Sequence, residues 1–102
     1  MPGKEKRCIC DMRGFLSFQI LWLLSKRDMC GNTLAEEIGK RKGEKPKAGT
    51  IYPALKELTA EGMIKGKRSG KEIVYSLTEA GRAELAAARS YFIKAFGEIL
   101  TR

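Results

Sequence analysis

The residues of this sequence that could do chemistry are mostly cations, and they are concentrated in its middle. Of the 20 Lys and Arg residues in the 102-residue chain, ten lie between residues 40 and 71, against three of the 12 Asp and Glu residues. The net charge of +8 therefore comes almost entirely from this central third. A localised positive region is typical of a surface that binds a polyanion such as nucleic acid.

Four of these cations fall within a short stretch that carries the pattern of a β-hairpin. Residues 64–68 and 72–77 are predicted strands, and Ser69 with Gly70 is a suitable tight-turn dipeptide between them. In the second strand, Ile73, Tyr75 and Leu77 alternate with Val74 and Ser76, as in a half-buried strand whose Tyr75 belongs to the core. We expect the hairpin to present cations to backbone phosphates: Lys65, Lys67, Arg68 and Lys71.

The groups that enzymes use are scarce. The sequence has no His, no Gly-rich phosphate loop, and carboxylates scattered over predicted helix surfaces. Cys8, Cys10 and Cys30 are an odd number and lack the spacing of a zinc site, so we expect reduced thiols and no disulfide framework. The sequence therefore predicts a protein that is not an enzyme and that holds no metal or cofactor.

The N-terminal region has the features of neither a membrane span nor a secretion signal. The longest apolar run, residues 15–24, is interrupted by Ser17 and Gln19 and is shorter than the roughly 20 residues that a bilayer requires. The preceding cations are not followed by a small-residue cleavage site. We expect a cytoplasmic protein without membrane contact, beginning with a flexible arm over residues 1–11.

Apolar spacing predicts three helices before the hairpin. The first covers residues 12–26, and the third runs from about residue 48 to residue 61, where Gly62 suits a left-handed stop. Between them, Gly31 and Asn32 should interrupt the chain, and Thr33 with Glu36 has the spacing of a capping box, which predicts a short helix over residues 33–41.

The third predicted helix has a clear inner and outer face. Ile51, Leu55 and Leu58 fall along one line and should point to the core. The remaining face is predicted to lie on the outside, where it could enter a DNA groove together with the lysine that precedes the helix: Lys47, Thr50, Tyr52, Pro53 and Lys56.

A long last helix over residues 78–100, capped by Thr78, carries apolar residues at alternating steps of three and four: Leu85, Ala88, Phe92, Phe96 and Ile99. Such a seam packs lengthwise on a partner, and little in one small protomer is expected to cover it, which predicts a homodimer. Aromatic residues of the first and last helices form either core or the lining of a small-molecule effector pocket: Phe15, Phe18, Trp22, Phe92 and Phe96.

The order helix, helix, turn, helix, basic hairpin is that of a winged helix-turn-helix. The predicted fold class is mainly α with a small β-hairpin wing, and the chain is short enough for a single domain. We assign residues 12–77 to the winged-helix DNA-binding part and residues 78–102 to a C-terminal dimerisation helix in the same structural unit.

Three motifs carry a resemblance to a known family. The blocks Gly49-Thr50-Ile51-Tyr52-Pro53-Ala54-Leu55, Glu61-Gly62-Met63-Ile64 and Leu77-Thr78-Glu79-Ala80-Gly81-Arg82 resemble the signature of the PadR-like transcriptional regulators over about three quarters of the chain. The resemblance implies a dimeric winged-helix repressor that binds a palindromic operator in double-stranded DNA.

The sequence departs from the family pattern at two places. Cys30-Gly31-Asn32 stands where members commonly have His-Gly-Tyr, and Lys47 stands where a Ser is common, so a capping hydroxyl is missing at the start of the third helix. Two alternatives to a sequence-specific regulator stay open at this point: a winged helix that docks protein, and a non-specific architectural DNA-binding protein.

Overall fold

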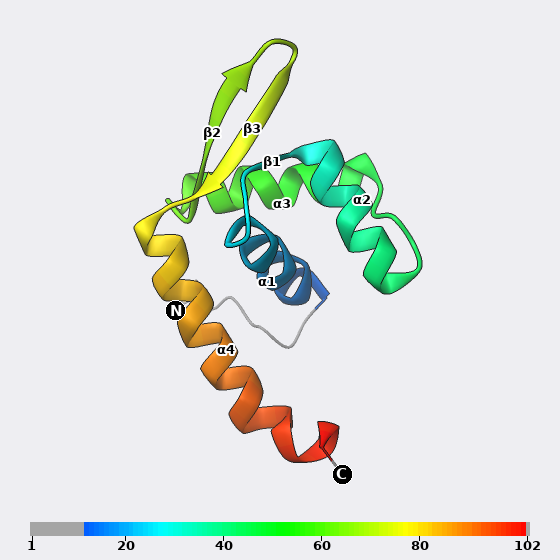
Figure 1. Cartoon of the computed structure of the whole chain (residues 1–102), viewed down its shortest axis with the longest axis vertical. Helices are drawn as coiled ribbons and strands as arrows, with labels where there is room; N and C mark the ends of the chain where they lie inside the picture. Colours follow the sequence, from blue (N-terminus) through cyan, green and yellow to red (C-terminus); the bar gives the residue numbers. More distant parts are fainter. Residues whose placement is uncertain (1–11, 102) are drawn as a thin grey trace.

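The computed structural model describes residues 12–101, and its elements follow the predicted winged-helix order (Figure 1). The predicted arm over residues 1–11, with Cys8 and Cys10, lies outside the described residues. The elements are α1 (Met12–Leu24), β1 (Met29–Cys30), α2 (Gly31–Lys42), α3 (Ala48–Ala60), β2 (Ile64–Ser69), β3 (Glu72–Leu77) and α4 (Glu79–Leu100).

One core holds these elements together. The largest side chains that are fully buried come from α1, α2, α3 and β2: Ile20, Leu34, Ile38, Ile51, Leu55 and Ile64. The predicted inner face of α3 is confirmed, since Ile51, Leu55 and Leu58 are at most 4% exposed. Burying such side chains stabilises the fold by about 1.5–3 kcal/mol each, so α3 is fixed by one face and leaves the other free.

The start of α2 differs from the sequence prediction. The helix begins at Gly31 and not at Thr33, its N-cap is Cys30 in extended conformation, and no side chain caps it. The predicted capping box is therefore wrong: the Thr33 hydroxyl lies 3.3 Å from the Sγ of Cys30, and Glu36 accepts from Asn32 instead. The reason is the short strand β1, which was not predicted; Met29 pairs with Tyr75 and Cys30 with Val74, so the chain stays extended up to residue 30.

The hairpin β2–β3, residues 64–77 and hereafter the wing, projects beyond the helices in Figure 1. The sheet order is β1-β3-β2, with all pairs antiparallel. Ser69 pairs with Glu72, so the turn residues are Gly70, at φ +64°, and Lys71, one position later than predicted. The predicted half-burial of β3 holds only toward its end, because Leu77 is buried, Tyr75 is half-buried and Ile73 is 41% exposed.

Thr78 joins the wing to α4 and confirms the predicted cap. Its hydroxyl oxygen accepts a hydrogen bond from the Gly81 N–H at 3.0 Å. The same hydroxyl donates to the carbonyl oxygens of Gly62, at 2.6 Å, and Met63, at 2.9 Å. Its own N–H donates to the Met63 carbonyl at 3.0 Å. A Cβ on Gly81 would overlap that same carbonyl, so only glycine lets the first turn of α4 approach so closely.

The first half of α4 packs inside its own protomer. Leu85 and Ala88 are 8% and 5% exposed, and the ring of Phe92 stacks on Phe18 with centroids 4.9 Å apart. The expectation that one protomer cannot cover the seam is therefore wrong for Leu85 and Ala88, because α1 lies alongside this part of α4. Farther along α4, apolar side chains remain exposed: Tyr91, Ile93, Ile99 and Leu100.

Membrane-spanning and metal-binding features are absent from residues 12–101. No helix in this described part of the chain is long and apolar enough to cross a membrane. No group of three or more metal-ligating side chains comes together within the same residues.

Candidate nucleic-acid interface

The outer face of α3 carries the predicted contact residues, and all of them are exposed. Thr50, Tyr52, Pro53 and Lys56 lie on the side of the helix away from Ile51 and Leu55. Lys47 is the N-cap, in extended conformation and without a side-chain cap, as its departure from the family pattern predicted. Its carbonyl receives the N–H groups of both Thr50 and Ile51, at 2.8 and 2.9 Å, which tightens the first turn.

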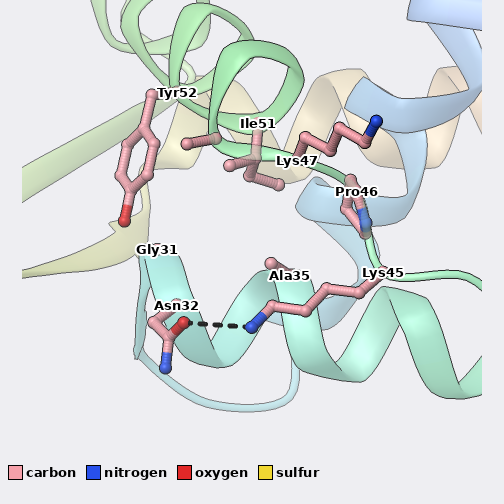
Figure 2. Close-up of a pocket in the computed structure, with 9 residues that line it drawn as sticks. Gly31, Asn32, Ala35, Lys45, Pro46, Lys47, Ile51 and Tyr52 are labelled. Carbon is pink, nitrogen blue, oxygen red and sulfur yellow. Dashed lines mark hydrogen bonds between the residues drawn. The ribbon is translucent and has the colours of Figure 1, made fainter.

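Tyr52 lies across the first turn of α2. A hollow of about 460 Å³ separates the first turns of α2 and α3, and Figure 2 shows Tyr52 extending along one side of it toward Gly31. On its floor the Nζ of Lys45 donates to the Oδ1 of Asn32 at 3.4 Å. The N-termini of α2 and α3 both border this hollow, and the N–H groups at a helix N-terminus carry a positive partial charge. The hollow is therefore positive both from these N–H groups and from Lys45 and Lys47, which line it.

A second groove of about 500 Å³ runs between α3 and the wing. Its α3 side is formed by Tyr52, Lys56, Thr59 and Ala60, and its wing side by Gly66, Ile73 and Tyr75. A third hollow, of about 250 Å³, lies between the start of α2 and the wing tip and includes Tyr52 and Lys71. Tyr52 lines all three hollows, which adjoin one another around its ring and together form one concave surface.

Alternation along β2 separates the wing cations onto two faces, and the register shows which residues of β3 share each face. Gly66 pairs with Tyr75 and Arg68 with Ile73, and paired residues point to the same side of a sheet. Arg68 therefore shares the groove side with Ile73 and Tyr75, whereas Lys65 and Lys67 point to the opposite side. Lys71 lies in the turn at the tip.

The wing cations have no acidic partner in the described part of the chain. Within residues 12–101, none of them forms an ion pair, whereas Glu37 of α2 pairs with Lys40 at 3.2 Å and with Arg41 at 3.7 Å. The hydrogen bond and the charge of Lys40 lower the pKa of Glu37. In the groove, burial raises the pKa of Tyr75, with a smaller contribution from Tyr52, so Tyr75 stays a neutral hydroxyl near neutral pH.

Part of this surface was not predicted from the sequence. Gly31, Asn32, Lys45, Ile73 and Tyr75 border the hollows but were not among the predicted contacts. The signal for the first two was the departure from the family pattern at residues 30–32. The signal for Ile73 was the glycine at position 66, whose lack of a side chain leaves room for Ile73 and Tyr75 over β2.

The aromatic residues of α1 and α4 pack on one another. Phe92 contacts Phe15, Phe18 and Phe96, with centroids 4.9–5.6 Å apart. The ring of Trp22 is covered by two cations, Lys26 at 4.6 Å and Arg41 at 4.7 Å. These contacts serve the packing of α1, and an effector site at these residues stays a prediction.

Known proteins resemble this chain in both sequence and fold. It is 36% identical over 62 residues to the transcriptional activator GvpE of Haloferax mediterranei, a match that covers 60% of this chain and 32% of GvpE. The chain thus spans about a third of the length of the curated relatives it matches.

Solved structures share most of the fold. A PadR family transcription regulator from Clostridium difficile R20291 superposes with a TM-score of 0.71 at 26% identity, covering 85% of this chain and 99% of that one. A transcriptional regulator from Clostridium thermocellum reaches a TM-score of 0.78 at 24% identity, covering 86% of this chain and 92% of the other, and at that identity shows the fold alone.

The sequence model described as the transcriptional regulator PadR-like family matches residues 20–87. That range runs from α1 to α4 and contains all three motifs that carried the resemblance. The chain therefore belongs to the PadR-like family of transcriptional regulators.

Proposed function

We propose that this chain is a sequence-specific transcriptional regulator that binds double-stranded DNA as a homodimer. The proposal rests on one observation: the exposed face of α3 and the exposed basic wing border the same concave surface, which Tyr52 lines. In this proposal α3 enters the major groove, where Tyr52 and Lys56 contact base edges, and Thr50 and Pro53 pack beside them. Lys47 and the wing cations Lys65, Lys67, Arg68 and Lys71 bind phosphates.

The two parts of the chain have different roles in this proposal. Residues 12–77 bind DNA, and residues 78–102 form the dimer through the exposed apolar end of α4. Ile99 and Leu100 are 71% and 76% exposed, which is costly for side chains of this size unless a partner covers them. A two-fold dimer would hold two α3 helices about 34 Å apart, one turn of duplex, and so would recognise an inverted repeat.

Repression is the direction of regulation that we propose. A protein that covers an operator inside a promoter excludes polymerase by occupancy and needs no further contact. The relative from Haloferax mediterranei is named an activator, so the direction has to be measured. A promoter fused to a reporter, with the selected operator in place, should lose expression when this protein is supplied; increased expression would contradict repression and leave DNA binding intact.

The DNA-binding proposal is tested by selecting bound fragments from genomic DNA and measuring affinity for a selected and a random duplex. Specific binding should be tighter by about 10³-fold or more, and both affinities should fall steeply with salt. Equal affinity for both duplexes would indicate an architectural protein. Absence of duplex binding would favour a winged helix that docks protein.

A further inference from the structure

The outer edge of β2 carries backbone hydrogen-bonding groups that no strand within residues 12–101 pairs. β2 is the last strand in the sheet order β1-β3-β2, on the outside of the wing (Figure 1), and its residues after Ile64 are exposed. One step before β2, the N–H of Thr78 donates to the carbonyl of Met63 at 3.0 Å. Because hydrogen-bonded and non-hydrogen-bonded pairs alternate along antiparallel strands, Gly66 and Arg68 direct their N–H and C=O groups away from β3.

The side chains beside this edge indicate which strand would fit it. Lys65 and Lys67 are exposed on one side of the hairpin, about 7 Å apart along the strand, so carboxylates at alternate positions of an added strand would lie opposite both. On the other side, a Cβ on Gly66 would stand 2.7 Å from Ile73 and 3.2 Å from Tyr75. An apolar side chain opposite this glycine would therefore contact both, in the groove between α3 and the wing.

We propose that β2 accepts an extended acidic segment of a partner protein as a fourth, antiparallel strand of the sheet. Acidic residues of the segment lie opposite Lys65 and Lys67, and the apolar residue between them lies opposite Gly66. Main-chain hydrogen bonds to Gly66 and Arg68 hold the segment in place. Duplex DNA could satisfy the lysines, but its backbone has no N–H groups to pair with the open edge.

The same two lysines bind phosphates in the proposed function, so the acidic segment competes with DNA and releases the regulator from its operator. This consequence rests on the proposed function. The binding of the segment does not, because it can be measured without DNA.

The test uses a peptide of about seven residues that alternates Glu and Val and is blocked at both ends. Fluorescence anisotropy measures its binding to the full chain at about 50 mM salt, without DNA. The proposed register places the Val residues opposite Gly66 and Arg68. N-methylation of the Val nitrogens removes the donors that face β2 and should weaken binding about tenfold or more. N-methylation of the Glu nitrogens, which point to solvent, should leave binding unchanged.

The contribution of the lysines is measured by changing Lys65 and Lys67 together to Gln. This variant should bind the unmethylated peptide about fivefold more weakly, because two exposed ion pairs are lost. The matched control changes Arg89 and Lys94, two exposed cations of α4, to Gln and should bind as the unmodified chain does. Thermal unfolding of both variants within a few degrees of the unmodified chain shows that both are folded.

Amide hydrogen exchange locates the bound peptide. The N–H groups of Gly66 and Arg68 should become protected by the unmethylated and the Glu-methylated peptides, and not by the Val-methylated one. The strand-addition proposal is overturned if the unmethylated peptide does not bind, if the two methylated peptides bind equally, or if protection appears only outside the wing. None of these results affects the proposed function.

Competition tests the connection with regulation. The unmethylated peptide should displace the selected duplex from the unmodified chain, and the Val-methylated peptide should not. If the chain binds both peptide and duplex without displacement, release from DNA is overturned. If the chain binds the peptide but no duplex, the proposed function fails and the strand-addition site stands.

Discussion

The ring of Tyr52 in α3 rests on Gly31, the first residue of α2. A Cβ placed on Gly31 would stand 2.7 Å from Cε1 and 3.0 Å from the hydroxyl oxygen of Tyr52. Contacts that short force a neighbour to move. The absence of a side chain at residue 31 therefore sets the position of a residue that borders every hollow of the proposed interface.

Gly31→Ala should displace Tyr52 and destabilise the fold by about 1–3 kcal/mol, as overpacking does, and should also weaken duplex binding. Gly49→Ala is the matched control, because Gly49 lies in the first turn of α3 and a Cβ added there would meet no atom within 4 Å. Urea denaturation and fluorescence anisotropy measure the two effects. Combining Gly31→Ala with Tyr52→Ala should restore part of the stability; strictly additive effects would show that the two residues do not interact.

Replacing Lys65, Lys67, Arg68 and Lys71 together by Gln should weaken binding to specific and random duplexes equally. The slope of log affinity against log salt should flatten by up to about 0.9 for each phosphate that the wing no longer neutralises. Neutralising the exposed cations Arg82, Arg89 and Lys94 of α4 is the control and should change the slope little. An unchanged slope in the wing variant would move the DNA-binding surface elsewhere.

Lys56→Ala should relax selectivity at one or two base pairs, at a cost of about 1–3 kcal/mol against the selected operator. Competition between operators with single base changes measures the effect. If affinity falls equally for every sequence, Lys56 binds a phosphate only.

Thr78→Val should destabilise the chain by about 1–3 kcal/mol, since it removes the cap of α4 and the hydroxyl that reaches the Gly62 and Met63 carbonyls. Thr101→Val provides the comparison, because the Thr101 hydroxyl makes a single exposed bond to Gly97 at 2.9 Å and should cost less than about 0.5 kcal/mol. If denaturant titrations showed the same loss of stability in both variants, the Thr78 hydroxyl would contribute no more than an ordinary surface hydroxyl.

Dimerisation is best tested at Ile93 and Ile99, which are 64% and 71% exposed. Changing both to Asp should give folded monomers in sedimentation equilibrium, and these should bind an inverted repeat no better than a half-site. Phe92 is a poor choice for this purpose, because it packs on Phe15 and Phe18 and its replacement by Asp would also destabilise the protomer. A monomeric unmodified chain at micromolar concentration would remove the basis for an inverted repeat.

Sequence periodicity was sufficient for the elements that bury a continuous face. Three features were predictable because each depends on residues close in sequence. They are the inner face of α3, the left-handed Gly62 (φ +77°) after the end of α3, and the Thr78 cap of α4. The start of α2 was not predictable, because it depends on the pairing of Cys30 with Val74, a residue that lies far from it in the sequence.

The same limit applies to the candidate site. The predicted outer face of α3 and the wing cations needed only helix and strand geometry. The roles of Leu85 and Ala88 required knowing that α4 folds back on α1. Strand alternation separates Arg68 from Lys65 and Lys67, but the register was needed to place Arg68 on the same side as Ile73, and a shift of one residue in the turn changes that pairing.

The sheet order β1-β3-β2 leaves β2 as an edge strand, with backbone groups on its outer side that no described strand pairs. Such an edge is a template for strand addition by another chain, and charged side chains are a common protection against it. Lys65, Lys67 and Arg68 all lie on this strand, so the cations that we propose to bind phosphates would also repel a second wing. Variants with a neutral wing should therefore be prone to aggregation, and bound DNA should protect the native chain by covering the same edge.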